Sequence, residues 1–249
     1  MRNRACKPRG SSPSPCNGRH GRAVVGLAFL LVAAGSLAAR AEVAASQPAQ
    51  ETLVLIRHGE KPEDGLGQLN CQGLNRSLAL PRVLAAKFGK PEFIFAPNPR
   101  QQTDDKGHHY DYIRALATIE PTAIQFGLPV NTQFGFRDVS QLRNEITQPK
   151  YQGSVVFVAW EHSLLVNLVK DLVAQGGGDP SQVPEWGPDD FDSIYVVQLA
   201  HLDGRLSVSF ARDKEGLDNQ SRHCPQAILP FRNRMVPHHG YRILNREPR

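Results

Sequence analysis

Four short apolar runs, each the length of a β-strand and separated by helical patterns, constrain the fold of this 249-residue chain most. They are rich in Val and Ile and do not alternate with polar residues. Unalternated runs of this kind are typical of central strands that helices cover on both faces. The order predicts an α/β fold with a mostly parallel, doubly wound sheet. The runs span residues 52–56, 93–96, 154–160 and 193–200.

The helical patterns lie between these runs. The clearest spans residues 163–175, with Ser163 as the expected N-cap, leucines on one face and three glycines after its end. Two other stretches contain Pro81 and Pro121, and each is expected to be kinked or to form two short helices. The last strand-length pair turns around residues 203–204 and predicts an antiparallel edge near the C-terminus.

The N-terminal segment predicts export. Residues 1–22 carry six Lys and Arg and no acidic residue, an apolar run follows, and Ala-Arg-Ala precedes Glu42. This is the layout of a secretory signal peptide, which we expect over residues 1–41. The protein is therefore expected to be periplasmic or secreted, without stable membrane insertion after cleavage. An uncleaved membrane anchor is the alternative.

The positive charge of the chain belongs to this leader. The formal net charge is +5, but removal of residues 1–41 takes away seven of the 29 Lys and Arg and none of the 24 Asp and Glu, which leaves −2. No nucleic-acid partner is therefore expected. We expect a linker over residues 42–50, one catalytic domain over 51–229 and a basic surface tail over 230–249.

Cysteine use agrees with export. Cleavage removes Cys6 and Cys16 and leaves Cys71 and Cys224, which an oxidising compartment could join. Two unpaired core residues are the alternative. The sequence has no Cys-x-x-Cys pattern, which excludes a structural zinc ribbon and the zinc deaminase signature.

Two histidines follow two of the predicted buried strands. Arg57-His58 ends the first run, and Glu161-His162 follows the run over residues 154–160. Ligands of open parallel sheets bind outside the carboxyl ends of the strands, so we expect both histidines at one edge. A second Arg-His-Gly tripeptide at residues 19–21 falls in the leader and is a coincidence.

These residue types suit phosphoryl transfer. A neutral imidazole such as His58 is a competent nucleophile toward phosphorus. The phosphoryl group carries dispersed negative charge during transfer, which fixed cations stabilise. The planar guanidinium of Arg57 can pair with phosphate oxygens and remains charged.

Four motifs together resemble the histidine phosphatase superfamily, which includes phosphoglycerate-mutase-like enzymes. The resemblance covers most of residues 52–200 and implies that His58 is the phosphorylated nucleophile, with Arg57 and His162 in the phosphate pocket. It implies no cofactor and no metal. The motifs are Arg-His-Gly-Glu at 57–60, LNCQGLNRSLALP at 69–81, YIRALATIEPTA at 112–123, and the strand that ends before His162.

The resemblance also implies a second pocket arginine at the start of a helix. Arg114 matches this position because Ala115 and Thr118 follow it at the family's spacing. Arg100 is the rival, since the segment around it is similar to another family pattern, but residues 103–111 are expected to form a polar loop. Arg76 is expected to be a helix residue at the pocket rim, with a solvated charge.

A leaving alkoxide needs a proton from a nearby carboxylic acid. The phosphoglycerate-mutase-like branch takes this acid from the segment after the arginine helix, which favours Glu145, with Asp138 as a rival. The acid-phosphatase-like branch places it after the second histidine, where this chain has Ser163 and instead offers Glu161 before it. Glu60 is expected to orient the pocket.

The sequence thus predicts an exported, metal-independent phosphatase that hydrolyses a phosphomonoester through a phosphohistidine. The substrate is expected to be a small phosphorylated molecule or a phosphoprotein. One alternative is a metal-dependent hydrolase that uses His58, Glu60 and His162 as ligands. The other is a non-catalytic protein that binds a phosphorylated ligand on the same scaffold.

Overall fold

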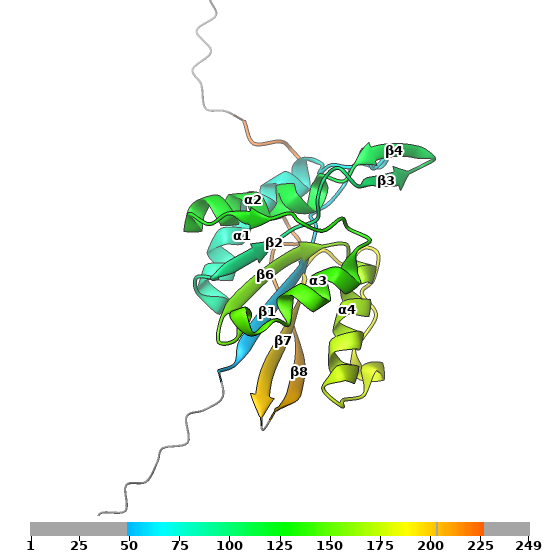
Figure 1. The fold of residues 1–249 in the computed structure, drawn as a ribbon. Helices are drawn as coiled ribbons and strands as arrows, with labels where there is room; N and C mark the ends of the chain where they lie inside the picture. The colour runs from blue at the N-terminus through cyan, green and yellow to red at the C-terminus, as the bar shows by residue number, and fades with distance from the viewer. Residues whose placement is uncertain (1–48, 203, 227–249) are drawn as a thin grey trace, which may run out of the picture. The chain divides into compact units, whose positions relative to one another are not determined.

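The computed structural model describes residues 49–202 and 204–226 (Figure 1). The predicted signal peptide, most of the predicted linker and the predicted basic tail lie outside the described residues. All described residues belong to one compact unit. No helix in this part of the chain is both long and apolar enough to cross a membrane.

A six-stranded sheet forms the centre of this unit, in the order β5-β2-β6-β1-β7-β8. The pairings among β5, β2, β6 and β1 are parallel, and β7 and β8 extend the sheet antiparallel. The predicted α/β fold with an antiparallel C-terminal edge is confirmed. The strands are β1 (Glu51–Arg57), β2 (Phe93–Phe95), β5 (Val130–Asn131), β6 (Val155–Trp160), β7 (Ser193–Leu202) and β8 (Arg205–Lys214).

Helices cover both faces of the sheet, as Figure 1 shows. Leu53 and Leu55 of β1 join one core cluster with α3 and α4, whereas Val54 and Ile56 join the other with α1 and α2. Both faces of β1 are therefore buried, which explains why its sequence does not alternate. The helices are α1 (Cys71–Phe88), α2 (Arg114–Phe126), α3 (Val139–Ile146) and α4 (His162–Gln175), with 3-10 turns at Pro149–Tyr151 and Pro180–Gln182.

The prolines do not divide the helices in two. Pro81 lies inside α1 and Pro121 lies inside α2, and each helix is one continuous element. The two-helix alternative is therefore wrong. Leu80 and Leu84 on either side of Pro81 are fully buried, and this packing offsets the backbone hydrogen bond that a proline cannot donate.

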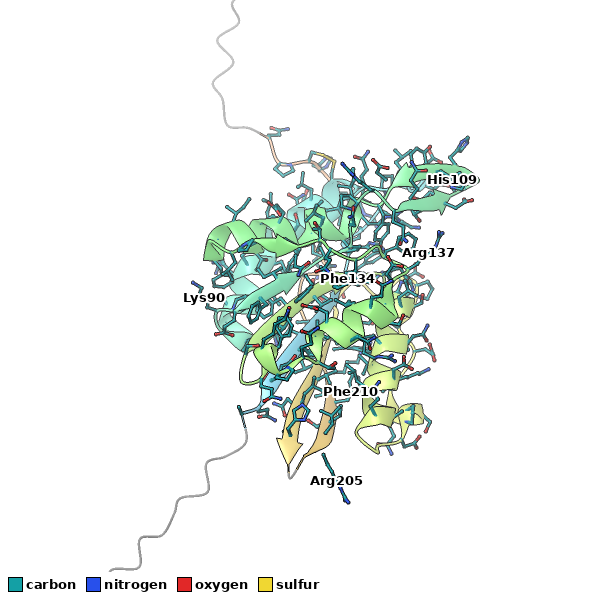
Figure 2. The ribbon with its side chains drawn as sticks, in the orientation of Figure 1. Lys90, His109, Phe134, Arg137, Arg205 and Phe210 are labelled. Atoms are coloured by element: carbon teal, nitrogen blue, oxygen red, sulfur yellow. A yellow bond between two sulfur atoms is a disulfide. The ribbon has the colours of Figure 1, made fainter. Side chains whose placement is uncertain are left out.

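A second, two-stranded sheet stands where a polar loop was expected. Strands β3 (Gln102–Asp105) and β4 (His108–Asp111) form an antiparallel hairpin, and His109 lies near its outer end (Figure 2). Lys106 and Gly107, which join the strands, both have positive φ, the conformation of a tight type I′ turn. The loop prediction failed because polar residues stand on both sides of the strands, so the segment lacks the apolar alternation of a half-buried strand.

After β8 the chain returns to the N-terminal end of α1. Residues 215–226, here called the C-terminal strap, are joined to α1 by a disulfide between Cys71 and Cys224. The two Cα atoms lie 4.5 Å apart. Of the two alternatives left open by the sequence, the structure contains the bridge.

Candidate active site

The two predicted histidines meet at the carboxyl edge of the sheet. His58 directly follows β1. His162 is the first residue of α4, and a single residue separates it from the end of β6. β1 and β6 are parallel neighbours in which Arg57 pairs with Trp160, and the His58 N–H donates to the Trp160 carbonyl at 3.1 Å. This register brings both histidines to one edge, as the sequence predicted.

His58 is held as a neutral imidazole with one nitrogen available. Its side chain is almost completely buried, with 3% of the residue exposed. Nδ1 lies 2.7 Å from the carbonyl oxygen of Gly59. Because a carbonyl oxygen only accepts, Nδ1 carries the proton and Nε2 carries the lone pair.

Burial lowers the pKa of His58 to about 3, against the opposing effect of the hydrogen bond to Gly59. The charges of Arg57 and Arg114 lower this pKa further. The ring is therefore uncharged at neutral pH, which is the form that can attack phosphorus.

Arg57 is fixed by a loop that follows the second 3-10 turn. One of its terminal nitrogens donates to three backbone carbonyl oxygens, and its guanidinium carbon lies 3.9 Å from the centre of the Phe191 ring. The buried Nε has no partner within the described residues. The carbonyls thus orient the guanidinium and leave other N–H groups for a ligand. They belong to Gly187, Pro188 and Asp190, at 3.2, 2.7 and 3.0 Å.

Of the two candidate second arginines, the structure brings Arg114 to His58. Arg114 is the buried first residue of α2, and its guanidinium carbon lies 5.1 Å from the centre of the Tyr112 ring. That ring also lies edge-on to His58, with 6.2 Å between centroids. Arg100 is exposed on the turn before β3. Tyr112 is a site residue that the sequence reasoning missed.

Asp105 is a second missed residue. It comes from the β3–β4 hairpin, is buried, and accepts hydrogen bonds from Nη2 of Arg114 and from the Gly67 N–H at 2.9 Å. Lys61 Nζ lies 3.8 Å from its other carboxylate oxygen. The hairpin therefore reaches the site through one inward-facing side chain.

Backbone contacts join the nucleophile segment to both helices of this face. The Gly59 N–H donates to the Thr118 hydroxyl at 2.9 Å, and this hydroxyl donates to the Arg114 carbonyl at 2.8 Å. In α1, a Cβ at Gly73 would lie 2.3 Å from the Glu60 carbonyl oxygen. Only glycine allows this approach. The segment after β1 is therefore held against α1 at Gly73 and against α2 at Thr118.

Glu161 does not have the properties of a proton donor. One carboxylate oxygen lies 2.6 Å from His162 Nδ1, and the other accepts from the Ser163 hydroxyl and the Leu164 N–H. Burial would raise the pKa of Glu161, but these hydrogen bonds lower it to about 2. These contacts favour the ionised form of Glu161 and argue against its assignment as the general acid, and it is Glu161 rather than Ser163 that caps α4.

Glu145 lies at the wrong end of the sheet. It accepts from the Tyr151 hydroxyl at 2.7 Å and lies 2.6 Å from Lys150 Nζ, just before β6 begins. The charge of Glu51, at the start of β1, also acts on Tyr151, so this group surrounds the amino edge. These contacts hold Glu145 away from His58 and argue against its assignment as the acid.

The other rival, Asp138, is also occupied elsewhere. Asp138 directly precedes α3 and accepts from the Gly135 N–H at 3.0 Å. In the part of the chain that the structure describes, no hydrogen bond or ion pair joins it to His58 or Arg57.

Arg76 is fully buried rather than solvated at the rim. Its Nε and Nη2 donate to the Glu60 carboxylate, and Nη1 lies 2.6 Å from Glu215. Asp192 and Asp218 lie 3.6 and 3.3 Å from its guanidinium. Four carboxylates thus compete for one cation, and burial raises the pKa of Glu215 to about 8.

The metal-site alternative fits these contacts poorly. Glu60 is engaged by Arg76, and His162 Nδ1 lies against Glu161. Among residues 49–202 and 204–226, no group of three His, Cys, Asp or Glu side chains is arranged to hold a metal ion. Arg57 and Arg114 would also repel a cation beside His58.

A cavity of about 580 Å³ opens beside Arg57. Its walls come from residues 60–63 after β1, the start of α1, the loop that holds Arg57, and Arg222 of the C-terminal strap. Its lining is mostly polar, which suits the part of a substrate that leaves the phosphate. Besides Arg57 and Phe191 it includes Lys61, Glu63, Asn70, Gln72, Asp189 and Arg222.

Comparison with known proteins finds similarity only in structure. No protein-family model and no curated protein matches this sequence. A proposed phosphohistidine phosphatase of Nakamurella multipartitia has 17% identity and a TM-score of 0.46 over 67% of this chain and 98% of its own. The mycobacterial glucosyl-3-phosphoglycerate phosphatase has 14% identity and a TM-score of 0.45 over 65% of this chain and 97% of its own.

A phosphoglycerate mutase of Plasmodium falciparum also matches, with 14% identity and a TM-score of 0.45 over 74% of this chain and 99% of its own. These three proteins are members of the histidine phosphatase superfamily, the group that the motifs of this chain resemble. At TM-scores below 0.5 the likeness does not establish an activity, which has to be argued from the site itself.

Proposed function

We propose that this protein is an exported, metal-independent phosphatase that hydrolyses a phosphomonoester through a phosphohistidine on His58. The observation that carries the proposal is the state of His58, which is buried and neutral, with Nδ1 bonded to Gly59 and Nε2 available. Arg57 and Arg114 provide the fixed positive charge that an incoming phosphoryl group requires.

The reaction has two displacements. Nε2 of His58 attacks phosphorus, the bond from phosphorus to the leaving oxygen breaks, and the electron pair goes to that oxygen, which takes up a proton. Water then attacks the phosphorus of phospho-His58, releases inorganic phosphate and restores the neutral imidazole. Arg57, Arg114 and His162 stabilise the charge on the transferring group in both steps.

For the proton donor we propose Asp189 in place of the three carboxylates considered above. Asp189 lines the cavity and stands between Pro188 and Asp190, whose carbonyls hold Arg57. A substrate phosphate bound at Arg57 would bring negative charge close to this carboxyl. A carboxyl beside the transferring group can donate a proton to the leaving oxygen.

Export and the class of substrate belong to the same proposal. A signal-peptide-like leader and a disulfide between Cys71 and Cys224 both fit an oxidising compartment. The polar cavity suits a small phosphorylated molecule or the phosphorylated side chain of a protein. The net charge of −2 after leader removal does not favour nucleic acid.

The test uses p-nitrophenyl phosphate in excess EDTA, with the protein expressed behind its own leader into an oxidising compartment. Wild type should turn over this substrate, and His58→Ala should lose at least about 10³-fold in kcat because it lacks the nucleophile. The control is His109→Ala, which removes an exposed histidine near the outer end of the hairpin. A trapped phosphohistidine that is absent from His58→Ala would identify the intermediate.

Other outcomes select the alternatives. Activity that EDTA abolishes and a divalent metal restores would replace the proposal with a metal-dependent hydrolase. No turnover, together with saturable binding of inorganic phosphate that His58→Ala weakens, would indicate a non-catalytic phospholigand-binding protein.

A further inference from the structure

The C-terminal strap is attached to α1 at several points. Cys224 is bonded covalently to Cys71, the first residue of the helix. The Gln72 side chain donates to the Asp218 carbonyl, and Arg76 pairs with the Asp218 carboxylate at 3.3 Å. The strap is therefore a fixed wall of the cavity beside Arg57.

Arg222 lies at the best-anchored point of this strap. A single side-chain nitrogen, Nδ2 of Asn75, donates to the carbonyls of Ser221 and His223, each at 2.8 Å. These residues flank Arg222 on both sides, and Cys224 follows directly. The backbone that carries Arg222 is thus held before any ligand binds, which reduces the entropy cost of using it for recognition.

The other charged groups of the cavity have partners or roles. The Glu60 carboxylate forms an ion pair with Arg76. The side chain of Glu63 is 95% exposed and its carboxylate lies 3.6 Å from Lys106 Nζ. Lys61 lies near Asp105. In the described chain Arg222 forms no hydrogen bond through its side chain and no ion pair, although it lines the cavity.

We infer that Arg222 binds a second anionic group on the leaving part of the substrate. The inference rests on the proposed function, in which Arg57 holds the phosphate that is transferred. A guanidinium offers a planar pair of donors that matches a carboxylate or a phosphate. The substrates are then small, polar phosphomonoesters whose alcohol carries a carboxylate or a second phosphate, and the strap selects them.

Three aryl phosphates test this inference: phenyl phosphate, 4-carboxyphenyl phosphate and benzene-1,4-diyl bisphosphate. Wild type should prefer one or both of the anion-bearing compounds. Arg222→Ala should reduce that preference, measured as a ratio of kcat/KM values to phenyl phosphate, by about 10- to 100-fold, the range of a charge-assisted hydrogen bond. Arg222→Lys should retain part of it. If Arg222→Ala loses the preference for 4-carboxyphenyl phosphate, the bound group is a carboxylate. If it loses the preference for the bisphosphate, the bound group is a phosphate.

Arg100→Ala is the matched control, because it removes an exposed arginine outside the cavity lining and should leave the preference unchanged. Cys224→Ser tests the strap and should weaken the same preference. An Arg222→Ala enzyme with the wild-type preference overturns the inference, while phenyl phosphate turnover keeps the proposed function intact. Wild type without turnover of any of the three compounds overturns both.

Discussion

The two ends of β1 each bury an ionisable side chain, yet they differ in what surrounds it. Glu51 begins the strand, is 2% exposed, and has one carboxylate oxygen without a hydrogen-bond partner among the described residues. Burial raises its pKa to about 8. His58 follows the other end and is equally buried, and its pKa is lowered to about 3.

Burial alone therefore does not mark a site. At the amino edge the shift in the pKa of Glu51 has desolvation as its cause, and among the described residues no ion pair joins Glu51 to a cation. At the carboxyl edge Arg57 and Arg114 act on His58, a carbonyl fixes its tautomer, and a cavity opens beside Arg57. A perturbed pKa points to function when fixed charges and a cavity converge on the group.

The largest effect is expected when a cation is removed from the carboxyl edge. Arg114→Ala should lower kcat/KM for p-nitrophenyl phosphate by about 10²- to 10³-fold, because a fixed donor to the transferring phosphoryl group is lost. Arg100→Ala should change it by less than about twofold. Steady-state kinetics of both variants measures the two effects. A larger loss of kcat/KM in Arg100→Ala than in Arg114→Ala would mean that Arg100 holds the phosphate.

A smaller effect is expected from the residue that orients this arginine. Asp105→Asn keeps an acceptor for the Gly67 N–H but removes the ion pair with Arg114, and should lower kcat/KM by about tenfold. The measurement separates kcat from KM and includes inhibition by inorganic phosphate. Asp104→Asn makes the same change on the exposed neighbour. Equal effects of the two variants would show that Asp105 acts only through the stability of the hairpin and does not orient Arg114.

The two ends of β1 should also make stability respond to pH in opposite directions. Unfolding lets His58 bind a proton between about pH 6.5 and 3, so its contribution to stability is lost as pH falls through this range. Unfolding lets Glu51 ionise between about pH 4.5 and 8, so its contribution is lost as pH rises.

Thermal unfolding between pH 3 and 9 measures both effects. His58→Gln should reduce the rise of Tm with pH between about pH 3 and 6.5, and Glu51→Gln should reduce the fall of Tm with pH between about pH 4.5 and 8, each by roughly a few °C. Profiles parallel to that of wild type would show that neither group changes its proton affinity on folding.

The smallest effect is expected at the amino edge. Glu145→Gln should leave kcat/KM within about twofold of wild type, because Glu145 contacts Lys150 and Tyr151 rather than the pocket. Loss of these contacts should lower Tm slightly. A large fall in activity for alkyl phosphates alone would restore Glu145 as the proton donor.

Local patterns predicted the parts of the site that lie on buried strands. The apolar runs before His58 and before Glu161-His162 predicted two buried parallel strands. Because such strands end at the same edge of the sheet, they also predicted where the two histidines lie. Arg114 was assigned from the family resemblance, because Ala115 and Thr118 follow it at the family's spacing. The contact of Arg114 with Asp105 was not predicted, because it depends on a polar hairpin without a hydrophobic pattern.

The failed assignments share one physical cause. Whether Arg76 is solvated or buried depends on Glu215 and Asp218, more than 130 residues later in the chain, and no periodicity reports such a contact. Glu145 was assigned from the family resemblance, which places the acid in the segment after the arginine helix but does not give the direction of α3 in this chain. The direction of α3 carries it instead toward the start of β6. Helix direction is set by packing and is not readable from one segment.

The bridge between Cys71 and Cys224 also sets an order of events during biogenesis. The two cysteines are 153 residues apart, and every strand of the main sheet except β1 lies between them. Cys224 leaves the ribosome after all strands have been synthesised, and under the proposed export its thiol would be oxidised only after transport. The wall that carries Arg222 is therefore completed last. Under the proposed function and export, the chain would until then have its nucleophile but lack its full selectivity, and its maturation would coincide with its arrival where thiols are oxidised.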